Sequence, residues 1–227
     1  MAKCFFLFLV SFSLFAQTSQ KPLIEGFQGM VVSTHPVASD VGLAILKKGG
    51  NSIDAAVAVN FALAVCHPSA GNIGGGGFLV YRDKAGNVKA LDYREKAPAA
   101  ASRDMYLDAE GKIIPGKSMT GIFSVGVPGT VAGMQEMHDK LGKLPWSVLL
   151  QPSVDLARNG LVLTEKEARG LNRQRTEFLK ENPGKNYLLS AEGKEWKAGE
   201  ILIQTDLANT LELILKKKSS GFYAGKT

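Results

Sequence analysis

The chain has 227 residues, of which 45% are apolar and 21% are charged, so it is long enough and apolar enough to bury a core. Its formal net charge of +6 is spread along the sequence. The only run of three cations is Lys216, Lys217 and Lys218, and no aromatic residues alternate with it. This pattern argues against a nucleic-acid-binding surface.

The N-terminus has the composition of a secretory signal peptide. Lys3 precedes an apolar run over residues 4–15, and Ala16 is followed by polar residues. The apolar run is too short to serve as a stable membrane anchor. We therefore expect residues 1–16 to be removed and the mature chain to be exported, to the periplasm or the medium, without an anchor.

Removal of this segment would leave one cysteine, Cys66, which cannot form an internal disulfide. Cys66 precedes His67, but it also ends a long apolar run, so a buried packing role is favoured over a reactive thiol. The three histidines, at 35, 67 and 138, are too scattered to indicate metal ligands. No metal and no cofactor is expected.

In the first half of the mature chain, the pattern predicts a strand, two helices and a β-hairpin. Residues 29–33 read as a short apolar strand, and apolar residues at helical spacing then run from Val37 to a stop at Gly49 and Gly50. Asn51 or Ser52 offers a cap for a second helix to Cys66, which is apolar nearly all round and should be buried. The hairpin is predicted from strands at 78–81 and 88–93 around a polar turn.

Four further helices are predicted in the second half. The first follows a short strand near residue 125, with Thr130 as its cap and Gly142 as its stop. The others are a helix capped by Ser147, interrupted at Pro152 and closed by Gly160; a charged surface helix over 164–180; and an amphipathic helix over 204–218 with Leu207, Leu211, Ile214 and Leu215 on one face. Trp196 is the expected anchor of the polar stretch 184–200. Residues 219–227 show no helix stop, strand or compact ending.

The hairpin is flanked by two features that point to chemistry. The four glycines at 74–77 permit unusually close approach of another backbone or a ligand, although they match neither common phosphate-binding pattern. Arg94 follows the second strand, and an arginine binds a carboxylate through two parallel hydrogen bonds. Taken alone, Arg94 is better explained by an ordinary ion pair with a neighbouring acid.

Several unusual stretches, taken in order, resemble the large-subunit region of the gamma-glutamyltranspeptidases (glutathione hydrolases). They are MVVSTHPVASDVGLAILKKGGNSIDAAVAV, GNIGGGGF, LDYREKAP with RDMYLD, SVGVPGTVAGM, and DLANTLELI with GFYAGK. The resemblance implies an α/β (α+β) fold, the N-terminal nucleophile hydrolase αββα sandwich. The sandwich should be incomplete, because the chain stops within the large-subunit region. Residues 17–28 would be a mature N-terminal segment, and 29–227 a partial large-subunit domain.

The resemblance also implies a self-cleaving precursor and a threonine nucleophile at the start of the small subunit, beyond residue 227. No catalytic residue is then expected in this chain, which should be inactive by itself. By its position in LDYREKAP, Arg94 would hold the α-carboxylate of the gamma-glutamyl donor, with Glu95 as a weaker companion. The partners implied are glutathione and other gamma-glutamyl donors, amino-acid or dipeptide acceptors, water, and the small subunit.

Ser33, Thr34 and His35 look like the Thr-Thr-His start of the small subunit, but they lie in the first strand-helix junction and are not expected to be the processing site. Two other functions remain open. The chain could be a non-catalytic remnant or binding module, since it lacks a nucleophile. It could also belong to a related acylase of glutaryl-type side chains, whose substrates also carry a distal carboxylate.

Overall fold

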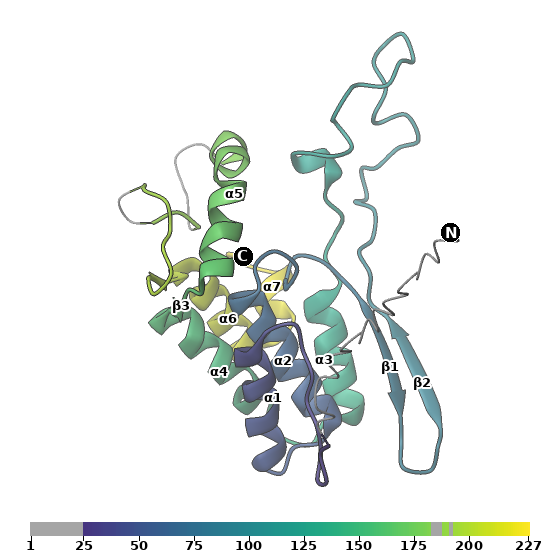
Figure 1. Ribbon diagram of the computed structural model, residues 1–227. Helices are drawn as coiled ribbons and strands as arrows, with labels where there is room; N and C mark the ends of the chain where they lie inside the picture. Colours follow the sequence, from purple (N-terminus) through teal and green to yellow (C-terminus); the bar gives the residue numbers. More distant parts are fainter. Residues whose placement is uncertain (1–24, 183–187, 191–192) are drawn as a thin grey trace, which may run out of the picture. The chain divides into compact units, whose positions relative to one another are not determined.

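The computed structural model describes residues 25–182, 188–190 and 193–227 (Figure 1). The described residues belong to two units, divided between residues 30 and 31. Within the first unit, residues 25–30 contain no helix or strand. The predicted signal peptide and residues 17–24 of the next segment lie outside the described residues, so both boundaries stay predictions.

Helix α2 (Ser52–Cys66) lies at the centre of the second unit (Figure 1). It packs against α1 (Pro36–Lys47), α3 (Thr130–Leu141) and α4 (Trp146–Asn159). Ten of its residues are buried, around most of its circumference, which confirms the expectation drawn from its apolar sequence. Its N-terminus carries a capping box, in which Asn51 and Asp54 each bind the backbone of the other.

A continuous core forms where these helices meet α6 (Thr205–Lys217) and the short α7 (Ser220–Tyr223). Helix α4 contacts both α2 and α6. The largest fully buried side chains in this core are Ile45, Ile53, Phe61, Met134, Leu149, Leu150, Leu211 and Ile214. Leu211 and Ile214 lie on the apolar face predicted for residues 204–218, so that helix and its orientation are confirmed.

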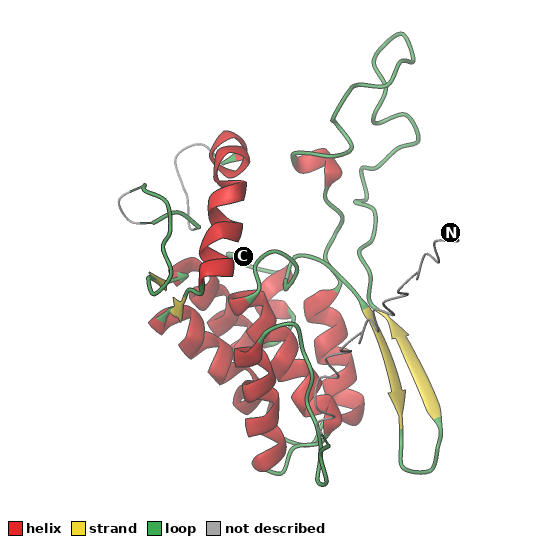
Figure 2. Cartoon of the chain, viewed as in Figure 1, coloured by secondary structure: helices red, strands yellow, loops and turns green. Residues whose placement is uncertain are grey.

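The predicted hairpin is formed by β1 (Phe78–Arg82) and β2 (Val88–Asp92), which pair antiparallel with Leu79 opposite Leu91 (Figure 2). Leu79 and Leu91 pack against the core, while Phe78 and Val80 on the other face are exposed. Strand β2 contacts α3. Between β2 and α3, residues 93–129 form a long loop that projects from the helices and contains a short 3-10 helix, η1 (Ile122–Ser124).

A second, smaller core lies under α5 (Glu165–Glu181). The two-residue strands β3 (Leu161–Val162) and β4 (Ile201–Leu202) pair beside it. Trp196 is buried there and its indole N–H donates to the Leu188 carbonyl at 2.8 Å, which confirms its predicted role as an anchor. Together, the helices and the two small sheets confirm the mixed α/β class.

Several local predictions are wrong, and each error has a tertiary cause. Residues 29–33 form no strand, since no described segment pairs with them. The predicted strand before α3 is reduced to a single bridge between Val127 and Lys96. The tail, predicted to lack a compact ending, forms α7 against α6.

Helix starts and a proline account for the remaining errors. Thr130 is the first residue of α3 rather than its cap, and its hydroxyl donates to Asn72 instead. Helix α4 begins at Trp146, whose buried indole N–H donates to the Ile214 carbonyl, so Ser147 is not the cap. Pro152 does not interrupt α4. A proline costs about 3 kcal/mol in a helix, but burial of Leu149, Leu150 and Val154 contributes roughly 1.5–3 kcal/mol each.

In the described ranges, no helix combines the length and the apolar character needed to cross a membrane.

The buried carboxylate of Asp54 joins α2 to the turn between α3 and α4. It is fully buried and accepts hydrogen bonds from three backbone N–H groups, those of Asn51 (2.9 Å), Lys143 (2.9 Å) and Leu144 (3.2 Å). Asn51 adds a bond from its side-chain amide to the Leu141 carbonyl at 2.7 Å. Two residues of α2's cap thus fix where α3 ends and where α4 begins.

We expect Asp54→Ala to lower the free energy of unfolding by about 3 kcal/mol, because it removes a buried acceptor and leaves three backbone N–H groups without it. Urea unfolding followed by circular dichroism measures this. The matched control is Asp206→Ala, which removes an exposed carboxylate from the first turn of α6 and should cost at most about 1 kcal/mol. Similar losses in the two variants would contradict the role given to Asp54.

Candidate functional site

The glycine run at 74–77 is the meeting point of three segments that are distant in sequence. The Gly75 carbonyl accepts hydrogen bonds from the N–H groups of Gly129 (2.8 Å) and Thr130 (3.0 Å), at the start of α3. A Cβ on Gly76 would lie 2.5 Å from the Cα of Arg94, closer than such atoms approach. The close backbone approach predicted from the glycine run is therefore present, and it involves Arg94 itself.

Tyr93 packs into a cradle of glycines beside this run. A Cβ on Gly129 would lie 2.0 Å from the Tyr93 carbonyl oxygen, and a Cβ on Gly133 would lie 2.3 Å from its ring. The backbone N–H of Tyr93 donates to the Gly77 carbonyl at 3.0 Å. Burial of the ring raises the pKa of the Tyr93 hydroxyl. The residue before Arg94 is thus held on several sides by main-chain atoms.

The Arg94 side chain, by contrast, projects into solvent from this fixed base. It is 63% exposed, and its guanidinium lies over the Phe78 ring at 5.1 Å from the ring centroid. Its Nε lies 3.6 Å from Asp92 Oδ1, an exposed ion pair. Among the described residues the guanidinium donates no hydrogen bond, so its two-pronged face is available to a ligand.

The structure pairs Arg94 with Asp92 rather than with Glu95. The same Asp92 oxygen also accepts the Arg94 backbone N–H at 3.0 Å. Glu95 is exposed and packs its Cβ near Gly126, beside the two backbone hydrogen bonds that join Lys96 to Val127. Sequence reasoning missed Asp92, although an acid two residues before an arginine on the same strand end was a usable signal.

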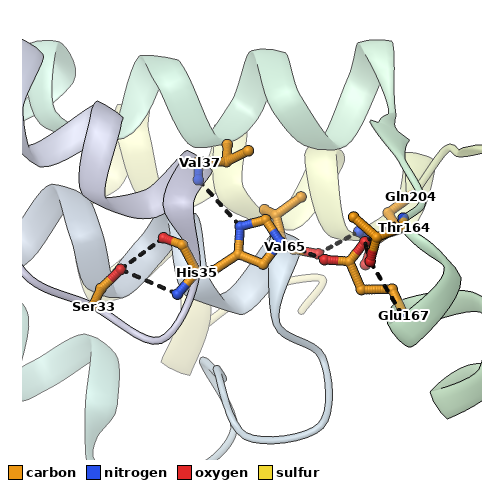
Figure 3. A network of polar contacts seen from close by, with 7 residues as sticks. All are labelled: Ser33, His35, Val37, Val65, Thr164, Glu167 and Gln204. Carbon is orange, nitrogen blue, oxygen red and sulfur yellow. Dashed lines mark hydrogen bonds and ion pairs between the residues drawn. The ribbon is translucent and has the colours of Figure 1, made fainter. Parts of the chain in front are cut away.

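A second polar network lies between α1 and α5 (Figure 3). His35 Nδ1 accepts from the Val37 N–H at 3.2 Å, so the ring proton is on Nε2, which donates to Glu167 at 2.5 Å. Glu167 in turn caps α5, accepting from the backbone N–H (2.7 Å) and the hydroxyl (2.8 Å) of Thr164. Burial opposes ionisation of Glu167, but these hydrogen bonds from Thr164 and His35 lower its pKa.

This network is not a nucleophile paired with a base. The Ser33 hydroxyl contacts the His35 backbone and not the imidazole ring (Figure 3). It also contacts the Ser39 hydroxyl. Ser33 and His35 therefore fix the start of α1. Cys66 nearby is fully buried, and burial raises the pKa of its thiol to about 11, which confirms a packing role.

Metal ligands and the hollow nearest to α4 lie outside this picture. Among the described residues, no three His, Cys, Asp or Glu side chains converge as metal ligands would. An open hollow between the end of α1 and α4, lined by Lys48, Gln151 and Asp155 among others, shares no residue with the Arg94 region. The region around Arg94 is thus the candidate for ligand binding, with an exposed cation on a rigid base.

Comparisons with known proteins place this geometry in context. A family model described as gamma-glutamyltranspeptidase matches residues 38–227. The glutathione hydrolase proenzyme of Pseudomonas sp. (strain A14) is 46% identical over 208 residues, which are 92% of this chain and 36% of that protein. The glutathione hydrolase proenzyme of Escherichia coli (strain K12) is also 46% identical, over 89% of this chain and 35% of that protein. The chain spans about a third of the length of the curated relatives it matches.

Two solved structures resemble this chain. The Helicobacter pylori gamma-glutamyltranspeptidase matches with a TM-score of 0.86 at 44% identity, covering 90% of this chain and 59% of that chain. The cephalosporin acylase from Bacillus halodurans matches with a TM-score of 0.80 at 26% identity, covering 95% of this chain and 40% of that one.

The glycine cradle predicts opposite effects for two glycine-to-alanine changes in helices. Alanine is favoured over glycine in a helix by about 1 kcal/mol, so Gly170→Ala in α5, with open space around it, should be stabilising. Gly133→Ala in α3 instead drives a methyl group into the Tyr93 ring and should lower the free energy of unfolding by about 1–3 kcal/mol. Urea unfolding of both variants checks this. Equal stabilisation by the two changes would show that Tyr93 is free to move.

Proposed function

The chain belongs to the gamma-glutamyltranspeptidase family, and from that premise we propose that it is the donor-binding part of an enzyme that transfers gamma-glutamyl groups and hydrolyses glutathione. The observation that carries the proposal is Arg94, an exposed guanidinium that pairs with Asp92 at 3.6 Å and donates no hydrogen bond to an acid of the described chain. It stands on a backbone that the glycine turn, the hairpin and α3 hold in place.

Membership has two consequences for fold and class. Family members are enzymes, and the match to both a gamma-glutamyltranspeptidase and an acylase confirms the N-terminal nucleophile hydrolase fold class predicted from the sequence. The chain covers 59% of the Helicobacter pylori chain, so the part of the fold described here is incomplete relative to that neighbour.

In the proposed reaction, Arg94 binds the α-carboxylate of the donor through two charge-assisted hydrogen bonds. Fixing that end of a flexible glutamyl group aims its gamma-carbonyl at the nucleophile, which lowers the entropy lost in reaching the transition state. Glu95 lies next to Arg94 in the chain and is proposed as a weaker contact at the rim of the same site.

The bond-breaking groups are proposed to come from polypeptide outside residues 1–227. A threonine exposed by self-cleavage of the precursor would attack the gamma-carbonyl, with its own amine as the base. The amine of the leaving group departs with a proton and leaves a gamma-glutamyl ester. Water, an amino acid or a dipeptide then takes the gamma-glutamyl group and releases the threonine. We also propose that the protein is exported after removal of residues 1–16.

A second candidate is an acylase of glutaryl-type side chains, and the likeness to the cephalosporin acylase from Bacillus halodurans favours it. Arg94 would serve both substrates, because each presents a carboxylate at the same distance from the reacting carbonyl. Identity favours the first candidate, at 46% to the Pseudomonas glutathione hydrolase proenzyme against 26% to the acylase. Comparing gamma-glutamyl with glutaryl amides as substrates of the processed full-length protein separates the two. A full-length protein that is properly processed yet turns over neither would support a binding module.

Changing Arg94 to Ala in the processed full-length protein should raise the KM for a gamma-glutamyl donor by roughly ten- to a hundredfold, as expected for loss of a charged hydrogen bond. Arg94→Lys keeps the charge but loses the two-pronged geometry, so its KM should lie between that of the unchanged protein and that of Arg94→Ala. The matched control is Arg169→Ala on α5, which removes an exposed arginine that pairs with Glu165. Donor kinetics unchanged by Arg94→Ala would remove Arg94 from the site.

A further inference from the structure

The start of α3 is capped by groups from outside the helix. Its N-cap residue, Gly129, has no side chain, and Thr130 is engaged with Asn72. The Thr130 N–H donates to the Gly75 carbonyl, and the Ala132 N–H donates to the hydroxyl of Tyr223 at 3.2 Å. The first turn of a helix needs such acceptors, and here they come from the glycine run and from α7.

Tyr223 makes a second hydrogen bond at the same place. Its hydroxyl donates to the Pro128 carbonyl at 2.8 Å while accepting from Ala132. One hydroxyl group therefore ties together the last turn of the long loop and the first turn of α3. Burial raises the pKa of Tyr223, while the hydrogen bond from Ala132 opposes that rise, so the hydroxyl keeps its proton and acts as donor and acceptor together.

The segment that carries Tyr223 is itself fixed along α3. The Ser219 N–H donates to the Gln135 side chain at 2.9 Å, and Lys218 pairs with Asp139. Residues 132, 135 and 139 lie on one face of α3, so the contacts with Tyr223, Ser219 and Lys218 follow one another along that face. The hydrogen bond from Lys218 lowers the pKa of Asp139. The segment before Tyr223 is therefore bound to α3 independently of Tyr223, and it holds Tyr223 near the start of that helix.

The two residues that Tyr223 joins flank the glycine that touches Tyr93. Gly129 lies between Pro128 and the first residue of α3, and a Cβ there would lie 2.0 Å from the Tyr93 carbonyl and 2.7 Å from that of Arg94. An outward shift of Pro128 or Gly129 would loosen the contact of Gly129 with the Tyr93 and Arg94 carbonyls and allow the main chain at Arg94 to move. Because packed groups transmit small shifts, one hydrogen bond at this point affects where the guanidinium stands.

We propose that Tyr223 is a positioning residue for donor binding, and that its hydroxyl acts by holding the 128–132 corner against Tyr93 and Arg94. The inference rests on the proposed function of Arg94 and deepens it. It assigns Tyr223 no contact with substrate. Removing the hydroxyl should weaken donor binding more than the later chemical steps, because Arg94 is proposed to bind the donor carboxylate and not to take part in bond breaking.

The test is Tyr223→Phe in the processed full-length protein, which removes the hydroxyl and keeps the ring. We expect the KM for the gamma-glutamyl donor to rise about three- to tenfold with kcat within about twofold of its original value, as for loss of ground-state binding. In an Arg94→Ala background, Tyr223→Phe should change the KM no further, because the two residues act on one contact. The matched control is Tyr106→Phe, which removes a hydroxyl that donates to the Phe123 carbonyl at 3.0 Å in the long loop.

The outcomes distinguish this inference from the proposal for Arg94. If Arg94→Ala raises the KM but Tyr223→Phe does not, the positioning role is overturned and the donor site stands. If Tyr223→Phe raises the KM equally with Arg94 present or absent, the hydroxyl acts through another route and the inference is also overturned. If Arg94→Ala has no effect, both fail. A Tyr223→Phe variant that loses stability and kcat with an unchanged KM would show a role in folding alone.

Discussion

The close contact of the Tyr93 and Arg94 backbone with glycine residues is the constraint on which the candidate site depends. Gly76, Gly129 and Gly133 all approach this dipeptide to distances at which a side-chain carbon has no room. Glycine carries an entropic cost in regular structure, so such positions are informative where the packing requires them. Here the packing brings the hairpin exit, the glycine run and α3 to one point, and Arg94 leaves from it.

The backbone N–H groups at helix starts explain how the remaining segments are joined. The start of α2 is capped by Asn51 and Asp54, and Asp54 also reaches Lys143 and Leu144 beyond α3. The caps of α1 and α5 meet through His35 and Glu167. The start of α3 takes its acceptors from the glycine run and from Tyr223. Since unpaired N–H groups are costly when buried, each cap also fixes a tertiary contact between distant segments.

Whether a helix is capped by neighbouring or by distant residues also decides how well the sequence predicts it. Helices α2 and α5 were predictable because their caps are local, as with Thr164 and Glu167 at the start of α5. Helix α6 was predictable from its apolar pattern. The hairpin was predictable from alternation around a polar turn. The starts of α3 and α4 were not, because Thr130 donates to Asn72 and Trp146 binds Ile214, partners 58 and 68 residues away.

Of the candidate site, Arg94 was found through the family resemblance, and Asp92 was missed. Tyr223 left no local signal, since its contacts span more than ninety residues.

The exposure of Arg94 is itself part of the argument for ligand binding. An exposed arginine–carboxylate pair is worth about 0–1 kcal/mol, so Asp92, at 3.6 Å, holds the guanidinium only weakly. A ligand carboxylate that engages both terminal nitrogens forms the stronger, two-pronged arrangement and need not break a buried ion pair to do so. Phe78 supports the guanidinium from one side without competing for its hydrogen-bond donors. A rigid backbone, a weak resting partner and free donors together keep the arginine oriented and allow an incoming carboxylate to displace Asp92 at small cost.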